Sequence, residues 1–352
     1  MKVGICTGGG DCPGLNAAIR AVVKHGIRTH QMEFVGIFDS FNGLQERPLR
    51  HTKLDNSSVV EILHRGGTIL GTYNKGSCFS GPDGREKIKL TREGFDSMGL
   101  DALVVIGGEG TQGMSSSLIE AGIPITGIPK TIDNDLPGTE TTIGFSSCVD
   151  LVAESVQRLR STAESHDRIM ILEVMGRDSG YIALHGGVAG GANAILIPEI
   201  PFSWDSLVKK INYRKSLGRN FSLVVVSEGA TVVNSDQQYQ ETADGRQVLG
   251  GIGQIAAVRL QELTGMETRV TVLGHLQRGG QPNATDKILA TRMGVYACDL
   301  IAKGIHNQVV SSVGSNISHT PFTKIQAHAR RKISPNDSLI TAAEGIGICL
   351  GR

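Results

Sequence analysis

The chain has 352 residues, of which 39% are hydrophobic and 4% aromatic, and its formal net charge is +1. This length and composition describe a chain that can bury a large core, most simply in two domains. The near-neutral charge and the few aromatic rings disfavour a nucleic-acid binder, which would normally show a basic stripe and rings for stacking. No stretch reaches the ~20 apolar residues of a membrane-spanning helix, and the first apolar run is too short for a signal peptide, so we expect a cytoplasmic protein without membrane contact.

The cysteine spacing argues against a disulfide framework or a zinc site. None of the six cysteines stands in a Cys-x-x-Cys pair, and their spacings match no tetrahedral metal motif. We therefore expect buried, reduced thiols and no structural metal. The six are Cys6, Cys12, Cys78, Cys148, Cys298 and Cys349.

Short apolar runs alternate with helical patterns in chain order, as is typical of βαβ units around a parallel sheet. The paired segments are 2–6 with 13–27, 101–108 with 111–122, and 168–176 with 179–191. The strongest helical pattern lies at 148–162, where four apolar side chains form one stripe. A second series, with strands expected at 194–199 and 223–229, follows this helix. The pattern predicts an α/β protein with two doubly wound, Rossmann-like three-layer domains and an exposed polar loop at 231–247.

Glycine is abundant, with 46 of 352 residues, or about 13%, against an average of ~7% in proteins. These glycines gather where apolar runs end. The first cluster, "TGGGDCPG" at 7–14, follows a predicted strand and precedes a helix, so its amides are placed to bind an anion. The chain contains no Gly-Lys-Ser/Thr, which excludes a Walker loop. An ordinary turn with Asp11 as helix N-cap remains an equal alternative for this loop alone.

The second cluster, "GGEGTQG" at 107–113, fits the Gly-x-Gly-x-x-Gly pattern of dinucleotide-binding proteins. A nicotinamide site would need one acid for the ribose, and Asp133 stands at a suitable distance. That interpretation leaves Thr131 and Asp135 unexplained, and Glu109 is unfavourable beside a pyrophosphate unless a magnesium ion lies between them. Phosphoryl transfer accounts for all of these residues, because it needs amides and cations for phosphates, a carboxylate for metal and a carboxylate for the hydroxyl proton.

The motifs "GGGDCPGLNAAIR", "PKTIDND", "EVMGR" and "LGHLQRGG" occur in an order and spacing that resemble the 6-phosphofructokinases of the bacterial A type, across roughly residues 2–300. The resemblance implies transfer of a phosphoryl group to the 1-hydroxyl of fructose 6-phosphate, giving fructose 1,6-bisphosphate in glycolysis, with Mg²⁺ as cofactor. It also implies a donor-binding domain of residues 1–144 plus about 257–305 and a sugar-phosphate domain of residues 145–256 plus about 306–352.

The same resemblance implies roles for individual residues. Asp133 is the expected base, with Thr131 and Arg177 as further catalytic residues, and Glu109 and Asp135 are the expected metal ligands. Glutamate at 109 replaces the family's usual aspartate. The donor would contact Gly9, Asn74, Lys75, Gly108, Glu109, Gly110, Thr111 and Lys130. The sugar phosphate would contact Thr131, Ile132, Asp133, Arg168, Met175, Gly176, Arg177, Glu228, Arg269, His275, Leu276, Gln277 and Arg278.

Arg168 and Arg269 are expected to reach into a neighbouring subunit's sugar site, which implies a homo-oligomer, a tetramer or a dimer. Two departures from the family limit these expectations. Lys75 stands near a position where many bacterial relatives place a phosphate-binding arginine, and a lysine lacks the guanidinium fork. Effector cations would be Arg20, Lys24, Arg65 and Arg160, yet Asn193 replaces a common glutamate, so we expect altered or absent allosteric control.

The phosphoryl donor is expected to be ATP. Pyrophosphate users resemble an Asp plus Lys pair at positions 110 and 130, most bacterial ATP users a Gly plus Gly pair, and this chain has Gly110 with Lys130. A carboxylate at 110 would repel the α-phosphate of a nucleotide, whereas a lysine at 130 imposes no such exclusion. The alternatives left open are a pyrophosphate-dependent enzyme, a nicotinamide-dependent enzyme and a non-catalytic paralogue that binds an effector.

Overall fold

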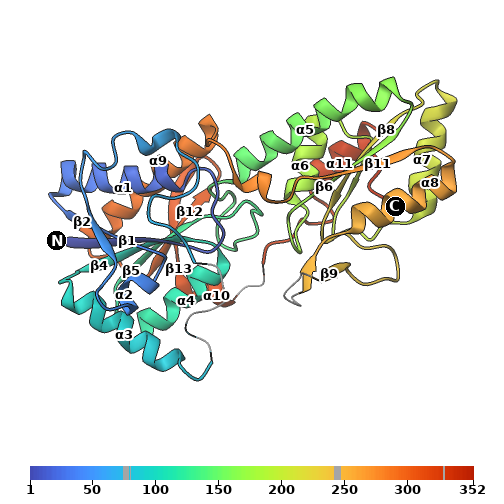
Figure 1. Cartoon of the computed structure of the whole chain (residues 1–352). Coiled ribbons are helices and arrows are strands. Elements are labelled where there is room, and N and C mark those ends of the chain that lie inside the picture. Colours follow the sequence, from blue (N-terminus) through green and yellow to red (C-terminus); the bar gives the residue numbers. More distant parts are fainter. Residues whose placement is uncertain (74–78, 80, 242–246, 328–329) are drawn as a thin grey trace. The chain divides into compact units, whose positions relative to one another are not determined.

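The computed structural model describes residues 1–73, 79, 81–241, 247–327 and 330–352. The chain forms two compact units, each built around its own parallel sheet (Figure 1). Unit 1 contains Met1–Ile132, Leu136–Ser147 and Arg278–Arg330, and unit 2 contains Asp133–Asp135, Cys148–Gln277 and Arg331–Arg352. The expected α/β class with two domains is confirmed. No helix of the described ranges is long and apolar enough to cross a membrane.

Unit 1 is centred on a seven-stranded sheet in the order β13-β12-β5-β4-β1-β2-β3. Its five inner strands are parallel, and β3 and β13 pair antiparallel at the two edges. The strands are β1 (Lys2–Gly8), β2 (Glu33–Ile37), β3 (His51–Leu54), β4 (Ala102–Gly107), β5 (Ile125–Pro129), β12 (Gln308–Val313) and β13 (Asn316–Pro321). Because β1, β4 and β5 are neighbours and parallel, their carboxyl ends and the loops that follow them meet at one edge of the sheet.

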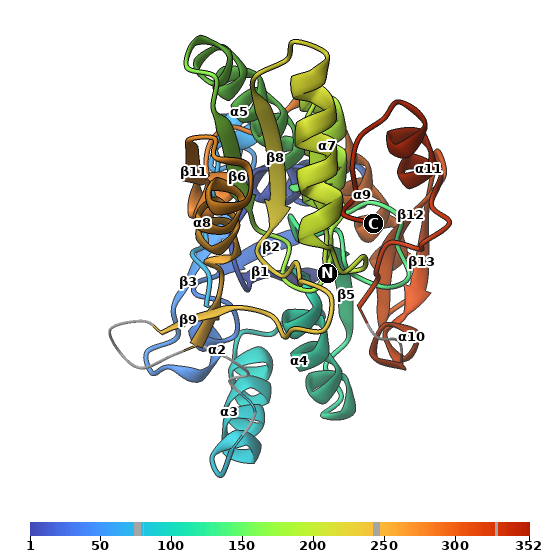
Figure 2. The ribbon, with the colours of Figure 1, turned by 90° about the vertical axis from the view of Figure 1, so that its right-hand side faces the viewer.

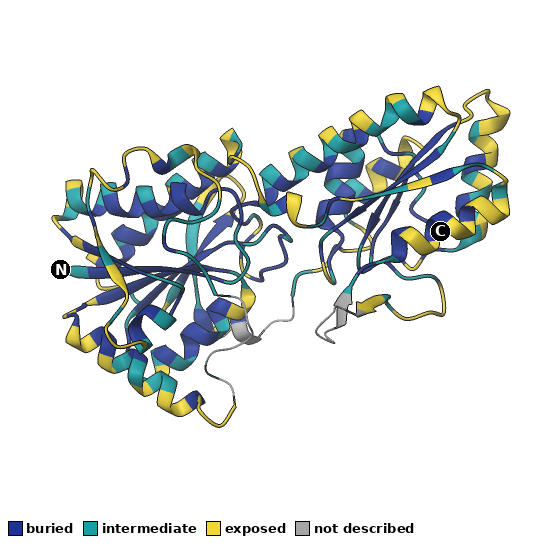
Figure 3. Ribbon diagram, in the orientation of Figure 1, coloured by how far each residue is buried: buried dark blue, intermediate teal, exposed yellow. Residues whose placement is uncertain are grey.

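Helices cover both faces of this sheet, with α1 and α9 packed together on one face and α3, α4 and α10 on the other (Figure 1). The helical segments are α1 (Leu15–His30), α2 (Asn42–Gln45), η1 (Ile62–His64), α3 (Gly84–Ser97), α4 (Glu109–Glu120), α9 (Ala284–Ala302) and α10 (Phe322–Ala327). The five inner strands are largely buried, whereas the edge strands β3 and β13 and the outer faces of the helices are more exposed (Figure 3). This double covering explains why the strands read as continuous apolar runs instead of alternating patterns.

Unit 2 has a four-stranded parallel sheet in the order β11-β6-β8-β7 and a small antiparallel pair, β9 with β10. Figure 2 shows β6 and β8 running side by side, as their pairing requires. The strands are β6 (Ile169–Val174), β7 (Ala194–Leu196), β8 (Ser222–Ser227), β9 (Tyr239–Glu241), β10 (Gln247–Leu249) and β11 (Thr268–Val272). The helical segments are α5 (Phe145–Ser165), α6 (Tyr181–Gly190), α7 (Trp204–Ser216), α8 (Ile252–Thr264), η2 (Gly274–Arg278) and α11 (Ser338–Gly345).

The helix expected at 148–162 is confirmed as α5, and its apolar stripe packs on the glycine-rich helix α6. A Cβ added at Gly186 would lie 2.4 Å from Val152, and one added at Gly190 would lie 2.6 Å from Val156. Only glycine at these positions allows the two helices to approach so closely. The opposite face of the sheet is covered by α7 and α8, whose apolar residues share one core with β6 and β8.

The compact units differ from the expected domain ranges in the C-terminal half. Part of α8 and the whole of β11 fall within the range 257–305 assigned to the first domain, yet β11 pairs with β6 in unit 2. Strands β12 and β13 fall within 306–352, assigned to the second domain, yet β12 pairs with β5 in unit 1. An apolar run predicts a strand but does not say which sheet the strand joins.

Candidate active site

The amino end of α4 lies at the carboxyl end of β4, without a side-chain cap. The N-cap is Gly108, whose backbone is extended and whose lack of a side chain leaves the cap without a side-chain hydrogen bond. The amides of the first helical turn have no intrahelical acceptor, and they point toward whatever lies before the helix. Gly110 is exposed in this turn, and a Cβ added there would meet nothing within 4 Å. The helix end therefore has room and donors for a phosphate group.

Thr111, expected to contact the donor, is instead packed into the sheet. It is 2% exposed, and its side chain lies where Cβ atoms at Gly8 and Gly107 would be, at 2.7 and 2.5 Å. These two glycines are required because the first turn of α4 presses against the ends of β1 and β4. Only the backbone amide of Thr111 is placed to serve an anion at the helix end.

Lys130 is buried, which the sequence alone did not predict. The side chain is 3% exposed, and its ammonium donates a hydrogen bond to the carbonyl of Gly10 in the loop after β1. Its backbone amide donates to the carbonyl of Gly107 at 3.1 Å. Lys130 thus ties together the ends of β1, β4 and β5. On the other side of the loop, a Cβ at Gly10 would lie 2.4 Å from the guanidinium of Arg278, so this arginine packs on the same glycine backbone.

Gly9, in this loop, has a left-handed backbone with φ 78°, and its amide donates to the Tyr73 carbonyl at 3.0 Å. The alternative role of Asp11 as N-cap of α1 is not observed, because Gly14 occupies that position. Asn74 and Lys75, also expected at the donor, lie outside the described residues, as does Cys78. The other five cysteines form no disulfide bond among the described residues, and burial raises the pKa of the Cys12 thiol to about 12.

Glu109 points a partly exposed carboxylate from the first turn of α4 and pairs with Arg330. Arg330 Nη2 lies 2.9 Å from Glu109 Oε2. The side chains of Glu109 and Arg330 are 49% and 25% exposed, respectively. Nothing in the sequence pointed to this arginine, which stands in the C-terminal region far from the glycine loop.

The segment 133–135 belongs to unit 2 and is fixed there by Arg331. The backbone amide of Arg331 donates to the carbonyl of Asp135 at 2.7 Å, and its guanidinium lies 5.1 Å from the centre of the Tyr181 ring. Asn134 has a left-handed backbone with φ 54°. Such a conformation costs free energy in a non-glycine residue and often marks a functional segment. Asp133 is partly exposed, whereas Asp135 is buried at 5% exposure.

Thr131 and Ile132, the preceding residues, belong to unit 1. The carbonyl of Thr131 accepts a hydrogen bond of 2.6 Å from the Thr142 hydroxyl, and the Thr131 side chain is partly exposed. Ile132 is 4% exposed, so its side chain is part of the core. Of the two residues, only Thr131 presents a side chain that a ligand can reach.

The carboxyl end of β6 gathers several expected sugar-phosphate residues within unit 2. Arg177 has a left-handed backbone with φ 51°, and its amide donates to Glu228 Oε1 at 3.0 Å. The amide of Met175 donates to Gln277 Oε1 at 3.2 Å. Gly176 has φ 143°, and a Cβ there would lie 2.4 Å from a neighbouring carbonyl. The arrangement presents Arg177 on a strained turn, with Glu228 held beneath its backbone.

The pKa of Glu228 is raised above its ordinary value by burial, although hydrogen bonds from the amides of Arg177 and Gly176 act in the opposite direction. His275 and Leu276 are exposed and Gln277 is buried. Because His275 is exposed, its imidazole is not part of the core and can be reached by a ligand. Arg278, one residue further along the same short helix η2, belongs to unit 1.

Arg168 and Arg269 share one acidic partner, Glu267, in unit 2. Arg168 Nε lies 2.8 Å from Glu267 Oε2, and Arg269 pairs with the other carboxylate oxygen. The hydrogen bond from Arg168 is the main cause that lowers the pKa of Glu267. The sequence analysis overlooked Glu267, although it stands two residues before Arg269 in a charged stretch.

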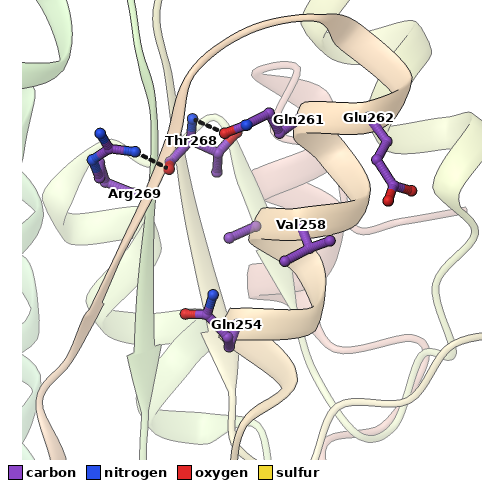
Figure 4. Close-up of a pocket in the computed structure, with 7 residues that line it drawn as sticks. Gln254, Val258, Gln261, Glu262, Thr268 and Arg269 are labelled. Carbon is purple, nitrogen blue, oxygen red and sulfur yellow. Dashed lines mark hydrogen bonds between the residues drawn. The ribbon is translucent and has the colours of Figure 1, made fainter.

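Arg269 also lines a hollow of about 480 Å³ between β11 and α8, together with Gln254, Val258, Gln261 and Glu262 (Figure 4). Three apolar side chains, one each on α8, β11 and η2, are exposed in unit 2. Val258, Val272 and Leu276 are 54%, 59% and 68% exposed, respectively. This surface of unit 2 combines a cation, a hollow and exposed apolar side chains.

The expected effector cations are only partly brought together. Arg20 and Lys24 line one hollow of unit 1, with His25 and Arg28. Arg160 belongs to unit 2, where its Nη2 donates to the Gly191 carbonyl at 2.8 Å. In the same unit, the Asn193 side chain accepts a hydrogen bond from the Leu223 amide at 2.9 Å, so this asparagine holds the start of β8.

Comparison with known proteins finds relatives over the full chain. The family described as phosphofructokinase matches residues 2–301. The ATP-dependent 6-phosphofructokinase 1 of Synechocystis sp. is 44% identical over 357 residues, which cover 100% of this chain and 98% of that protein. The pyrophosphate–fructose 6-phosphate 1-phosphotransferase of Amycolatopsis methanolica is also 44% identical, over 333 residues that cover 94% of this chain and 96% of that protein.

Solved structures agree with these sequence relationships. The phosphofructokinase of Pichia pastoris in the T-state superposes with a TM-score of 0.83 at 32% identity; the match covers 99% of this chain and 37% of that longer chain. A pyrophosphate-dependent phosphofructokinase from Marinobacter aquaeolei has the same fold, with a TM-score of 0.80 at 22% identity over 99% of this chain and 88% of that one. This chain therefore belongs to the phosphofructokinase family.

Proposed function

We propose that this chain is an ATP-dependent 6-phosphofructokinase that phosphorylates the 1-hydroxyl of fructose 6-phosphate. The observation that carries the proposal is the open amino end of α4, where an exposed Gly110 leaves room for a nucleotide phosphate. The relatives support it, because proteins from Synechocystis sp., Chloroflexus aurantiacus and Clostridium perfringens named ATP-dependent 6-phosphofructokinases are 44%, 44% and 41% identical over nearly the whole chain.

Asp133 is the proposed base. It accepts the proton of the sugar 1-hydroxyl as that oxygen attacks the terminal phosphorus of the donor, and the bond from phosphorus to the ADP oxygen breaks. The backbone of the adjacent Asn134 is held in a left-handed conformation, which supports a fixed position for this segment. Thr131 binds the sugar, and Arg177 stabilises the charge that spreads over the transferred phosphoryl oxygens.

The donor phosphates are held by Gly9, Gly108, Gly110 and the amide of Thr111, with Asn74 and Lys75 as further proposed contacts. The amides in the first turn of α4 suit this role because they have no intrahelical acceptor, whereas the Gly9 amide already donates to the Tyr73 carbonyl, so Gly9 would contribute only its lack of a side chain. Lys130 acts by holding the loop after β1 through the Gly10 carbonyl, and its buried charge favours anions nearby. The sugar phosphate is held by Met175, Gly176, Glu228, His275 and Arg278, with Leu276 beside them. The side chains of Ile132 and Gln277 are buried and act by holding the neighbouring backbone in place.

Magnesium is the proposed metal, with Glu109 and Asp135 as its protein ligands. The Glu109 carboxylate fits this role because it is partly exposed and lies in the first turn of α4, beside the proposed donor phosphates. Magnesium prefers one or two carboxylates together with phosphate oxygens and water. When bound, the ion would neutralise charge on the donor phosphates. Arg330 occupies the same carboxylate oxygen in this structure, so it is expected to compete with the metal.

Pyrophosphate remains the second candidate donor. Two observations favour it: the Amycolatopsis methanolica relative is as similar to this chain as the cyanobacterial one, and Lys130 matches the lysine of pyrophosphate users. The exposed Gly110 argues for ATP, because pyrophosphate users place an aspartate there. The nicotinamide-dependent alternative is not supported by membership of this family.

We also propose a homo-oligomer in which Arg168 and Arg269 complete a neighbouring subunit's sugar site. The support is the surface around Arg269, where a hollow lies beside exposed apolar side chains such as Val258 and Val272. Exposed apolar surface of this kind is typical of protein interfaces. A tetramer or a dimer satisfies this proposal, and the expected cytoplasmic location stays a prediction.

The test is product formation from fructose 6-phosphate with magnesium and either ATP or pyrophosphate. The purified protein is expected to form fructose 1,6-bisphosphate and ADP with ATP, and much less product with pyrophosphate. Product only with pyrophosphate would overturn the choice of donor, and no product with either donor would overturn the proposed function. Omission of magnesium, with a chelator present, is the matched control for the metal.

A further inference from the structure

Two histidines of α1 and one aspartate of α9 meet where these two helices pack together (Figure 1). The Nε2 atoms of His25 and His30 each lie 2.8 Å from the same oxygen, Asp299 Oδ1. The three side chains bring one possible ligand atom each to within 4.8 Å of the other two. None of these residues takes part in the proposed phosphoryl transfer, so the cluster needs a separate explanation.

We propose that His25, His30 and Asp299 form a binding site for a divalent first-row transition-metal ion such as Zn²⁺. Two imidazoles with one carboxylate suit zinc, nickel or copper, whereas magnesium prefers oxygen ligands alone. Zinc bonds of ~2.0–2.1 Å at tetrahedral angles place ligand atoms roughly 3.3 Å apart. Each 2.8 Å contact would therefore lengthen by about half an ångström, which small side-chain rotations allow.

The site is accessible to an ion from solution. The side chains of His25, His30 and Asp299 are 22%, 24% and 37% exposed, respectively. Each is therefore held by its surroundings but not sealed in the core. Three protein ligands leave a fourth position for water, as in open zinc sites.

A hydrogen bond outside the cluster supports the orientation that a metal requires. Thr29 Oγ1 lies 3.3 Å from His25 Nδ1, on the ring nitrogen opposite the one that faces Asp299. Without metal, the tautomer of His25 with its proton on Nε2 would donate to Asp299 and accept from the threonine hydroxyl at Nδ1. With metal, the proton resides on Nδ1 and is donated to Thr29, which leaves the Nε2 lone pair for the ion. Metal-binding histidines commonly donate their second ring N–H to such a partner.

Some charges near the cluster attract a metal cation and others repel it. His30 is the last residue of α1, where the negative end of the helix dipole favours a cation. Asp299 adds a carboxylate whose Oδ1 faces both imidazoles at 2.8 Å. Arg20, Lys24 and Arg28 line the same hollow as His25 and repel a cation. We expect the three ligands to outweigh this repulsion.

The test is zinc binding to the full-length protein after treatment with a chelator and its removal. Equilibrium dialysis with metal analysis is expected to show one zinc ion per chain that is lost in His30→Gln and Asp299→Asn. Removal of a direct ligand should weaken binding by more than about tenfold, since even outer-shell partners contribute about tenfold to a hundredfold. His51→Gln is the matched control, because His51 is an exposed histidine on β3 outside the cluster.

Cobalt supplies a second measurement that reports the ligands directly. Co²⁺ at the same site should give visible absorption of a four- or five-coordinate ion, and His25→Gln should abolish it while the circular dichroism spectrum stays unchanged. Equal zinc binding by the wild type, His30→Gln and His51→Gln would overturn the proposal. So would a wild type that binds no zinc at micromolar concentration.

Discussion

Replacement of Gly110 by aspartate is the sharpest test of the proposed donor site. The added Cβ would meet nothing within 4 Å, and Gly110 lies exposed in the first turn of α4. An acidic side chain in the first helical turn stabilises a helix by ~0.3–1 kcal/mol. The Gly110→Asp variant should therefore fold as well as the wild type, so that a change in activity reports on the donor and not on unfolding.

The expected loss follows from Coulomb repulsion between the new carboxylate and a nucleotide phosphate. Two like charges ~4 Å apart repel by ~1 kcal/mol in water and by ~4 kcal/mol at an effective dielectric constant of ~20. Because position 110 is exposed, the lower half of this range, ~1 to ~2.5 kcal/mol, applies. Since each ~1.4 kcal/mol is a factor of ten, kcat/KM for ATP should fall roughly fivefold to seventyfold.

The assay is steady-state formation of fructose 1,6-bisphosphate with varied ATP and saturating fructose 6-phosphate. Gly110→Asn is the matched control, because asparagine has the size of aspartate without its charge. We expect the asparagine variant to keep most of the ATP-dependent activity. Equal losses in both variants would show that the size of the new side chain, and not its charge, lowers ATP-dependent activity. No loss in Gly110→Asp would refute the placement of the donor at this helix end.

Four further predictions concern other parts of the site. Asp133→Asn should keep fructose 6-phosphate binding but lose about 10²-fold to 10⁴-fold in turnover, the usual contribution of a general base; near-normal turnover would refute its role. Arg269→Ser should weaken sugar-phosphate binding roughly tenfold to a hundredfold. Hybrids of this variant with Asp133→Asn should regain activity if Arg269 acts across an interface, and verified hybrids without activity would place it in its own subunit's site. Arg330→Gln should lower the magnesium concentration needed for half-maximal activity, because it frees the Glu109 carboxylate; an unchanged or higher requirement would contradict the proposed competition. Burial raises the pKa of Glu228 above its ordinary value of 4.5, so the folded protein favours the protonated carboxyl group. The contribution of this group to the free energy of unfolding is therefore lost as the pH rises from 4.5 through the raised pKa. Urea unfolding should therefore show Glu228→Gln gaining stability relative to the wild type over this pH range, and a difference independent of pH would contradict the assignment.

Local sequence patterns predicted the elements of this fold but not all of their partners. The strands at 2–6 and 101–108, the glycine loops after them and the helix at 148–162 were all predicted, since apolar periodicity and glycine clusters are local signals. The sheet that β11 or β12 joins depends on pairing between distant strands, which no local pattern encodes.

The same limit applies to the site. The glycines around α4 and the strained turn at Arg177 lie within motifs, so the sequence located them. The pairing of Glu109 with Arg330 joins residues 221 positions apart, and that of His25 with Asp299 joins residues 274 positions apart. No spacing rule links such residues, and only the tertiary structure brings them together: His25 and Asp299 meet where α1 packs on α9, and Arg330 reaches Glu109 from a segment outside the helices.

The difference in burial between Gly110 and Lys130 changes how these two residues bear on the choice of donor. The two positions count equally in the sequence, one matching ATP users and the other pyrophosphate users. In the structure, Gly110 is exposed at an open helix end, whereas the ammonium of Lys130 is buried and donates to the Gly10 carbonyl. Removal of a buried cation that ties two loops together disturbs the loops whichever donor is used. We therefore infer that Lys130→Gly impairs the use of ATP and pyrophosphate alike, so that position 110 alone discriminates between them. A Lys130→Gly variant that lost pyrophosphate use but kept ATP use would contradict this inference.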